Sequence, residues 1–447
     1  MAPLLSRLPV GMSCRPLPLG LQMRSMLPSS HRGRVGCVGG HLASSSRSAA
    51  SSSKEKLPPH LQAFVDAYDR KRAEEMKYMP AFLQSSKAGA LGVGVALVVM
   101  YWMQCSDDTS STLHRVTWPW LLKRYSAEDA HKFLLKAAQK KWLPRDYDKD
   151  DPYMMLHPRP SLKLNNPVGL ASGFDTQGVV PVALFNVGFG SLEVGPFDVD
   201  SSEELQSARE QLSSVVRRGE TLELMLAGLG VLGAAVKGSH DRVIKSVKLL
   251  GPYLDYLAIT APLSTDKESL RQLMTTAKQT SDGVVGGGPH IFLKVVVPEQ
   301  DRSGEAFASL HAAATAALAA DCTGIVISEG DTLSDAGKVN LATLKRAVSV
   351  AYQATEGQLV ILAASDIRSG CDAVELIEAG ASGVQISAGL LSEGPYMCRR
   401  MKTEVCMVLR NQAHATLEEA VGREHRNSKK GKRPKNPWAR GSTASSA

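Results

Sequence analysis

The sequence predicts an α/β protein whose main domain is a (β/α)8 TIM barrel, preceded by an N-terminal helical membrane-associated extension with one transmembrane helix. The first observation is residues 166–196, where an apolar run ended by Ser172-Gly173, a helix-spaced apolar stretch and a second apolar run form one βαβ unit. The second is that strand-like runs then alternate with helical patterns. The third is the length of 447 residues, which accommodates one barrel of roughly 250–300 residues plus extensions.

A βαβ unit joins parallel strands, so the continued alternation predicts a closed parallel sheet. The eight expected strands cover residues 167–171, 191–195, 222–226, 256–260, 291–297, 324–327, 360–363 and 383–387. The connections include the helices expected at 242–249, 341–354 and 372–378. Ligands of such barrels bind at the carboxyl ends of the strands, where Gly173 and Gly195 would let a ligand approach the backbone. Tight turns are the alternative explanation for these glycines.

Composition excludes several functional classes. The net charge of +8 lies largely in the two ends of the chain, so the folded part is near neutral and nucleic-acid binding is not indicated. The seven cysteines include no Cys-x-x-Cys pair and no His/Cys spacing typical of a metal site. We therefore expect buried free thiols, with neither a disulfide framework nor a metal centre.

Both ends of the chain are basic. Residues 1–54 are rich in arginine and serine and contain no acidic residue, which is typical of a mitochondrial targeting leader; plain disorder is the alternative. Residues 55–87 mix charges with apolar residues at helical spacing and are expected to form an amphipathic or linker segment. Residues 426–447 are expected to form a basic disordered tail, or else to bind anionic lipid or an acidic partner.

Residues 88–106 are predicted to form a transmembrane helix. Residues 88–105 contain no charge, and Tyr101 and Trp102 near one end suit a membrane interface, since ~20 apolar residues span a bilayer. A buried core helix is the alternative. Basic residues dominate before the segment and Asp107-Asp108 follow it, so the positive-inside rule predicts a single-pass inner-membrane protein whose bulk faces the intermembrane space.

Residues 107–147 are expected to form the helical extension, and residues 148–425 the barrel. Ser126 followed by Glu128 and Asp129 is typical of a helix start. The apolar face of this stretch would dip into a membrane surface or cap the barrel.

Residues 166–178 read NPVGLASGFDTQG, residues 188–195 read GFGSLEVG and residues 250–257 read LGPYLDYL. These three motifs resemble those of the class 2, quinone-type, mitochondrial dihydroorotate dehydrogenases, and they occur in the same order. The first two match the first two barrel strands of that family, with Thr176 in place of its lysine. The resemblance extends from about residue 118 to 425, which is nearly the whole predicted extension and barrel.

The resemblance implies an enzyme that oxidises dihydroorotate to orotate with FMN, in pyrimidine biosynthesis, and passes the electrons to a quinone. If FMN is bound, the resemblance assigns its contacts to Ala171, Ser172, Gly173, Gly195, Lys294, Ser328 and Gly337. His131 falls on the histidine of the family's quinone tunnel. A lysine in an apolar strand is also hard to bury alone, so Lys294 needs a ligand or a carboxylate partner.

The ligand-binding motifs depart from the family pattern. An ungapped alignment puts Leu263 at the catalytic serine, whereas one inserted residue would make Ser264 the candidate base. The phosphate-binding motif, at residues 363–370, reads AASDIRSG and lacks its glycine pair. Asp366 sets a carboxylate beside the expected phosphate, and at ~4 Å and an effective dielectric of ~20 the repulsion is on the order of 4 kcal/mol per charge pair, unless Arg368 compensates.

Because scaffold motifs are kept while ligand motifs are lost, the hypothesis that we favour is a catalytically degenerate member, a pseudoenzyme with FMN absent or weakly bound. It would serve as a structural or accessory subunit of a respiratory or ATP-synthase-type complex, in contact with inner-membrane lipid. The alternative is an active dihydroorotate dehydrogenase (quinone), with Ser264 as base, Lys294 on the flavin and Arg368 neutralising Asp366. A third hypothesis is a binding protein for another small ligand in the same cavity.

Overall fold

The computed structural model describes residues 59–428, apart from residues 78–85, 106, 110, 149, 160–161, 218–229, 285–286, 300–303, 331–338 and 413–415. The chain divides into two units, Met1–Met100 and Tyr101–Ala447. The predicted leader, Gly337, the strand expected at 222–226 and the tail beyond residue 428 lie outside the described residues.

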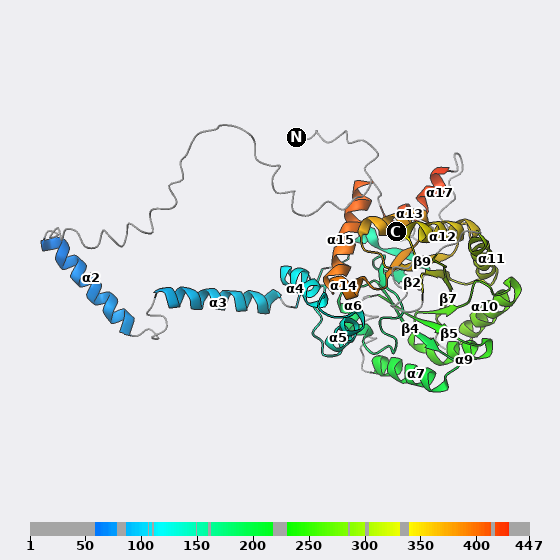
Figure 1. Ribbon diagram of the computed structural model, residues 1–447, viewed down its shortest axis with the longest axis horizontal. Helices are drawn as coiled ribbons and strands as arrows, with labels where there is room; N and C mark the ends of the chain where they lie inside the picture. Colours follow the sequence, from blue (N-terminus) through cyan, green and yellow to red (C-terminus); the bar gives the residue numbers. More distant parts are fainter. Residues whose placement is uncertain are drawn as a thin grey trace, which may run out of the picture. The chain divides into compact units, whose positions relative to one another are not determined.

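The second unit contains a closed barrel of eight parallel strands, in the order β10-β3-β4-β5-β6-β7-β8-β9 (Figure 1). The predicted α/β barrel is therefore confirmed. Its strands are almost continuously buried, because a parallel sheet covered by helices is shielded on both faces. They are β3 (Val168–Leu170), β4 (Ser191–Asp198), β5 (Val231–Lys237), β6 (Tyr256–Thr260), β7 (His290–Val296), β8 (Gly324–Ser328), β9 (Val360–Ser365) and β10 (Gly383–Ile386).

The third strand lies later in the chain than the sequence analysis predicted. It is β5, whose residues read VLGAAVK, and not the Leu-rich run at 222–226. Gly233 and the two alanines after it weaken the strand signal, since small residues score poorly for strand formation. The structure gives the reason for Gly233: a Cβ there would lie 2.0 Å from Cζ of Tyr256, whose ring fills this part of the barrel.

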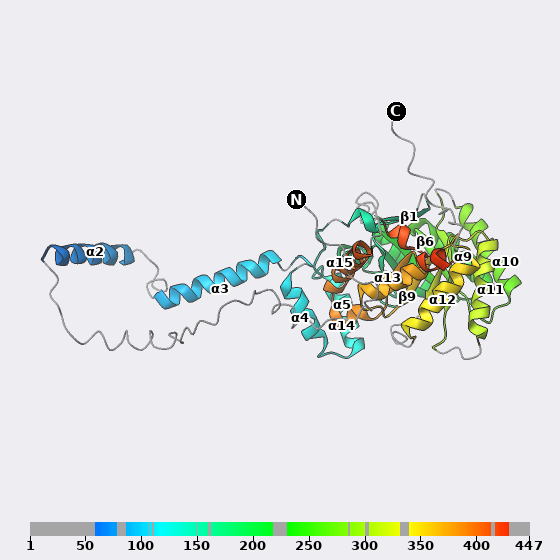
Figure 2. The same ribbon diagram turned by 90° about the horizontal axis from the view of Figure 1, so that it is seen from above.

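Helices surround the strands in chain order (Figure 1), and Figure 2 shows the same elements from above. Those expected at 242–249, 341–354 and 372–378 are present. The last helix runs to Ser428 and so includes the first three residues, 426–428, of the predicted disordered tail. The helices are α6 (Pro181–Asn186), α7 (Ser202–Arg217), α9 (His240–Leu250), α10 (Lys267–Asp282), α11 (Glu305–Ala319), α12 (Leu341–Ala354), α13 (Gly370–Ala379), α14 (Gly389–Glu393), α15 (Tyr396–Asn411), α16 (Leu417–Ala420) and α17 (Arg423–Ser428).

Two helices and a hairpin precede the barrel within the same unit. The helices are α4 (Thr112–Leu122) and α5 (Ala127–Gln139), and the antiparallel hairpin pairs β1 (Leu156–Arg159) with β2 (Leu162–Leu164). Ser126 caps α5 as predicted, because its Oγ accepts a hydrogen bond from the amide of Asp129 at 3.1 Å.

The remaining helices are α2 (Pro59–Lys77) and α3 (Ser86–Cys105), and the second coincides with the segment predicted to cross a membrane. Its described side chains are mostly apolar and exposed, among them Leu91, Val98 and Trp102. Within the part of the chain that the structure describes, no helix is both long and apolar enough to cross a membrane. The predicted span is therefore not confirmed.

Candidate active site

A lysine and a glutamate form a buried ion pair inside the barrel. Lys294 lies on β7 and Glu193 on β4, and their side chains are 1% and 0% exposed. The lysine Nζ lies 2.9 Å from Oε1 of Glu193 and also donates a hydrogen bond to Oγ of Ser172. The chain itself thus supplies a carboxylate partner of the kind that a buried lysine needs.

Two more polar side chains extend this ion pair across the barrel. Tyr256 on β6 donates to Oε2 of Glu193 at 3.2 Å and accepts from Nε2 of Gln385 on β10 at 2.9 Å. Burial, reinforced by the charge of Glu193, raises the pKa of Tyr256 well above its ordinary value, so the phenol stays protonated and can donate. Polar groups from four strands therefore form one connected network in the barrel interior.

The small residues predicted to approach a flavin lie together: Ala171, Ser172 and Gly173 follow β3, and Gly195 lies within β4, which runs on to Asp198 and does not end at Gly195 as predicted. The amide of Gly173 donates to the carbonyl of Gly195 at 2.7 Å, and their φ angles are 99° and 92°, in the region that favours glycine. Ala171 and Ser172 precede them and are buried. The positive φ angles already explain why glycine occupies both positions. Contact of these glycines with a flavin stays a prediction.

The two candidates for the catalytic position lie in the turn that follows β6. Leu263 is half-buried and packs against the hydrophobic core, whereas Ser264 is exposed. The amide of Thr265 donates to the carbonyl of Pro262 at 3.0 Å, which closes the turn around them. The residue packed toward the core is thus apolar, and the role of Ser264 as a base stays a prediction.

A buried carboxylate joins the carboxyl ends of the last three strands. Glu329 follows β8 directly and is 7% exposed. Its Oε2 accepts from Oγ of Ser365, the last residue of β9, at 3.1 Å. Its Oε1 accepts from Oγ of Ser387, which follows β10, at 3.0 Å. Ser328, predicted to contact a cofactor, bonds through Oγ to the backbone of Gly330 and so holds the adjacent turn.

Two further internal contacts lie in the segment after β9. Arg368 donates from Nε and Nη2 to Oδ2 of Asp366 at 2.8 and 2.6 Å. The amide of Gly370, which begins α13, donates to Oε2 of Glu404 on α15 at 2.7 Å. A Cβ at position 370 would lie 2.3 Å from Cβ of Glu404, so glycine is what allows α15 to approach. Carboxylates of the chain therefore bind donors at this end of the barrel.

His131, the predicted quinone-tunnel residue, connects the extension to the barrel. It lies on α5 and is half-buried. Its Nε2 is 2.5 Å from the carbonyl oxygen of Phe174, in the loop that follows β3, and the two rings meet edge-on with centroids 5.1 Å apart. The helix that carries His131 is thereby held beside the carboxyl end of β3, and a contact with quinone stays a prediction.

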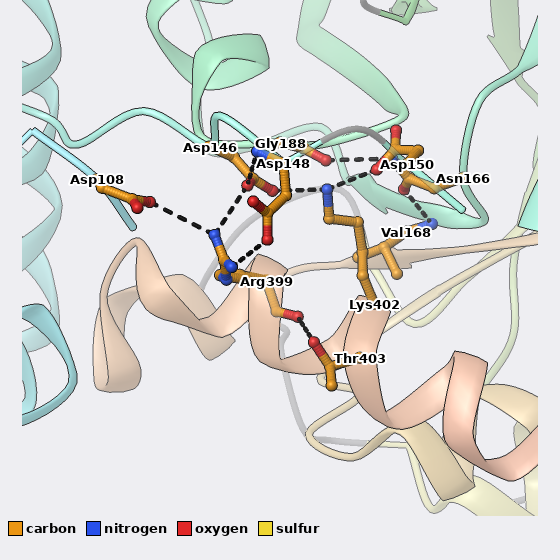
Figure 3. A network of polar contacts seen from close by, with 10 residues as sticks. All are labelled: Asp108, Asp146, Asp148, Asp150, Asn166, Val168, Gly188, Arg399, Lys402 and Thr403. Carbon is orange, nitrogen blue, oxygen red and sulfur yellow. Dashed lines mark hydrogen bonds and ion pairs between the residues drawn. The ribbon is translucent and has the colours of Figure 1, made fainter. Parts of the chain in front are cut away.

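A second polar cluster, which the sequence analysis missed, fastens the segment before the barrel to α15 (Figure 3). We call it the acidic clasp, and it consists of Asp146, Asp148, Asp150, Arg399 and Lys402. Nζ of Lys402 lies 2.6 Å from Oδ2 of Asp146 and 2.6 Å from Oδ1 of Asp150. Arg399 contacts Asp146 at 3.3 Å and also pairs with Asp148. The alternate spacing of the three acids was the signal available in the sequence.

The acidic clasp reaches the start of the barrel sheet. Asn166 donates from Nδ2 to Asp150 at 2.8 Å and accepts through Oδ1 from the amide of Val168, the first residue of β3, at 3.0 Å (Figure 3). A pocket of about 240 Å³ lies beside it. Burial lowers the pKa of Lys402, but neighbouring negative groups, Asp146 among them, outweigh this effect and hold it well above its ordinary value. Because acids and bases pair with each other here, we assign the clasp a structural role.

Known proteins resemble this chain in sequence. A family model described as dihydroorotate dehydrogenase matches residues 338–409. A dihydroorotate dehydrogenase (quinone) from Erythrobacter litoralis is 30% identical over 338 residues, which cover 66% of this chain and 96% of that protein. The chain belongs to the dihydroorotate dehydrogenase (quinone) family. The mitochondrial relative from Mus musculus is 28% identical over 384 residues, covering 75% of this chain and 96% of the relative.

A solved structure of the family has the same barrel. The crystal structure of DHODH from Eimeria tenella in complex with ferulenol gives a TM-score of 0.59 at 24% sequence identity, and covers 67% of this chain and 96% of that chain. At this identity the likeness supports the fold alone.

The cofactor implied by the family is FMN, whose phosphate is the group that the described residues can be tested against. Barrels of this kind frequently bind phosphate in the loops after the seventh and eighth strands. Here the hydroxyl groups of Ser365 and Ser387 at those strand ends donate to the carboxylate of Glu329. A second anion at this place would be repelled. As arranged, these residues do not fit the phosphate of FMN.

Proposed function

We propose that this member of the dihydroorotate dehydrogenase (quinone) family has lost the flavin-dependent reaction and is retained as a structural or accessory subunit. The observation that carries the proposal is the carboxylate of Glu329, bound to Ser365 and Ser387 where a phosphate would bind. At ~4 Å and an effective dielectric of ~20, a carboxylate opposes each phosphate charge by on the order of 4 kcal/mol, which corresponds to roughly a thousandfold weaker binding.

Two other positions support loss of the reaction. Leu263, which an ungapped alignment puts at the family's catalytic serine, packs against the core and has no group that can accept a proton. Lys294, at the position of a flavin-contacting lysine, is paired with Glu193 inside the barrel. Both side chains therefore have structural explanations that require neither substrate nor cofactor.

The alternative is an active dihydroorotate dehydrogenase that uses FMN and a quinone; the relatives are named dihydroorotate dehydrogenase (quinone). One observation favours it: Arg368 pairs with Asp366 and so removes part of the repulsion that a phosphate would meet. In such an enzyme Ser264 would be the base and Lys294 would contact the flavin.

The two functions differ in flavin content and turnover. The protein would be purified from membranes in mild detergent, and its flavin absorbance measured at roughly 350–500 nm. FMN, dihydroorotate and a quinone would then be added, with Ser264→Ala and, as a matched control in the same turn, Thr265→Ala. We expect a colourless protein without turnover in all three forms. About one flavin per chain, with turnover that Ser264→Ala abolishes and Thr265→Ala preserves, would refute the proposal.

We further propose that the protein works at the mitochondrial inner membrane, with its bulk facing the intermembrane space, in a respiratory or ATP-synthase-type complex. The basic leader, the mitochondrial relatives and the exposed apolar side chains of α3 support the location. Carbonate extraction of mitochondria and blue-native electrophoresis test it. We expect the chain to stay with the membrane and to migrate in a large complex; release as a free monomer would contradict this assignment.

A further inference from the structure

The ends of β9 and β10 occupy a special place in the barrel. Counting from β3, they are the seventh and eighth strands, and the loops after these two strands form the usual phosphate site of such barrels. Ser365 and Ser387 present buried hydroxyl groups at this place and are 5% and 8% exposed. Hydroxyl donors on neighbouring strand ends are groups with which proteins bind phosphate oxygens.

Glu329 reaches this place from the sixth strand, β8. Each of its two oxygens accepts one of the serine hydroxyl groups, at 3.1 and 3.0 Å. A carboxylate and a phosphate are both oxyanions that accept hydrogen bonds from such donors. Glu329 therefore makes with the two serines the contacts that a phosphate would make, and it remains 7% exposed.

The adjacent helix start follows the same pattern. The amino end of an α-helix attracts anions, because its first amides lack partners within the helix. In α13, which follows β9, the amide of Gly370 donates to the carboxylate of Glu404, and the amide of Asp372 donates to Oγ of Ser369 at 3.1 Å. These donors at the phosphate end of the barrel are thus bonded to groups of the chain itself.

We propose that Glu329 acts as an internal anion that takes the place of a ligand's phosphate and makes this barrel reject ligands that carry one, including FMN. This inference rests on the proposed function and specifies its physical cause. Replacement of Glu329 by a neutral side chain removes the repulsion and leaves at least one of the two hydroxyl donors available, since a glutamine has a single acceptor oxygen. The variant then prefers a phosphorylated ligand to the same ligand without phosphate.

FMN and riboflavin are suitable probes, because they share the isoalloxazine ring and differ in the phosphate group. Dissociation constants for both would be measured by quenching of flavin fluorescence with the full chain, as wild type and as Glu329→Gln. The matched control is Glu378→Gln, which removes one carboxylate at the opposite end of α13, where Glu378 pairs with Arg423 at 3.3 Å. Circular dichroism and melting temperature confirm that each variant is folded.

We expect the dissociation constant of riboflavin divided by that of FMN to lie below one in the wild type, because the phosphate is repelled, and to rise by about tenfold or more in Glu329→Gln alone. An unchanged ratio in a folded Glu329→Gln protein overturns the inference and removes Glu329 from the support for the proposed function, which then rests on Leu263 and on the pairing of Lys294 with Glu193. If Glu329→Gln does not fold, the same two dissociation constants are measured for Glu329→Ser and compared with those of the wild type. An unchanged ratio in folded Glu329→Ser overturns the inference. Wild-type protein that holds FMN and turns over dihydroorotate refutes the proposed function as well.

Discussion

Replacing Lys294 by methionine tests whether this lysine is kept for the fold or for a ligand. The side chains of Lys294 and Glu193 are 1% and 0% exposed, and Nζ lies 2.9 Å from the glutamate oxygen. At this distance and an effective dielectric of ~20 the attraction is about 6 kcal/mol, most of which offsets the cost of removing two charges from water. The intact pair therefore adds little net stability.

Removal of the lysine alone has a larger effect, because it leaves the carboxylate of Glu193 buried without its counter-charge. Breaking a buried pair in this way costs about 3–5 kcal/mol, which at roughly 2–4 °C per kcal/mol lowers the melting temperature by about 6–20 °C. The double variant Lys294→Met/Glu193→Gln should recover most of this loss, because the introduced glutamine is neutral and its carbonyl oxygen can still accept the hydrogen bond from Tyr256.

The assay is thermal and urea unfolding of the ligand-free protein, read as a double-mutant cycle. Our reasoning predicts a coupling energy of about 2–3 kcal/mol between positions 193 and 294. If Lys294→Met costs less than about 1 kcal/mol and the two substitutions are additive, the ion pair does not explain why the lysine is there. A stable Lys294→Met protein that has lost bound flavin would point instead to a role in cofactor binding.

Three further changes test other parts of the structure. Lys402→Met should cost up to about 3–5 kcal/mol of unfolding free energy, since buried Asp146 loses its nearer cation and keeps only Arg399 at 3.3 Å, and Lys402→Arg should cost less; equal losses in urea unfolding would contradict this. Gly233→Ala should lower the melting temperature, because overpacking against the ring of Tyr256 costs roughly 1–3 kcal/mol; an unchanged value would refute the packing. Burial, with two nearby basic side chains, lowers the pKa of His290 below 6.5, so its contribution to stability is complete above about pH 6.5 and is lost as the pH falls through the lower folded pKa. His290→Gln should reduce this acid sensitivity in pH-dependent melts, and parallel curves would contradict it.

The fold could be predicted from the sequence where buried strands are rich in Val, Ile and Leu. The runs that became β7, β8 and β9 are of this type, and the structure has strands there. β5 was missed because its interior volume is filled from another strand. Gly233 has no side chain, so that the ring of Tyr256 on β6 can lie against it, and the local sequence around β5 does not reveal that ring.

The candidate site was predictable only in part, because its contacts join residues distant in the chain. That a buried Lys294 needs a ligand or a carboxylate follows from its setting in an apolar strand, but the choice of Glu193 depends on how β4 and β7 face each other across the barrel. The contacts of Glu329 were still harder to predict, since the serines that bind it lie 36 and 58 residues further along the chain. The acidic clasp likewise joins Asp146 to the distant Lys402.

The polar groups inside the barrel share one property that bears on function. An enzyme keeps polar groups in its pocket available for substrate and cofactor, at a cost in stability. In this chain the carboxylate of Glu193 is bound by Lys294, and the serine hydroxyl groups at the ends of β9 and β10 are bound by Glu329. The polar groups that a ligand would use are thus bonded to one another within the fold. Stability and anion binding should therefore oppose each other at position 329: a neutral residue there frees at least one of the two hydroxyl groups for a phosphate, and the same change removes contacts that hold the last three strands together.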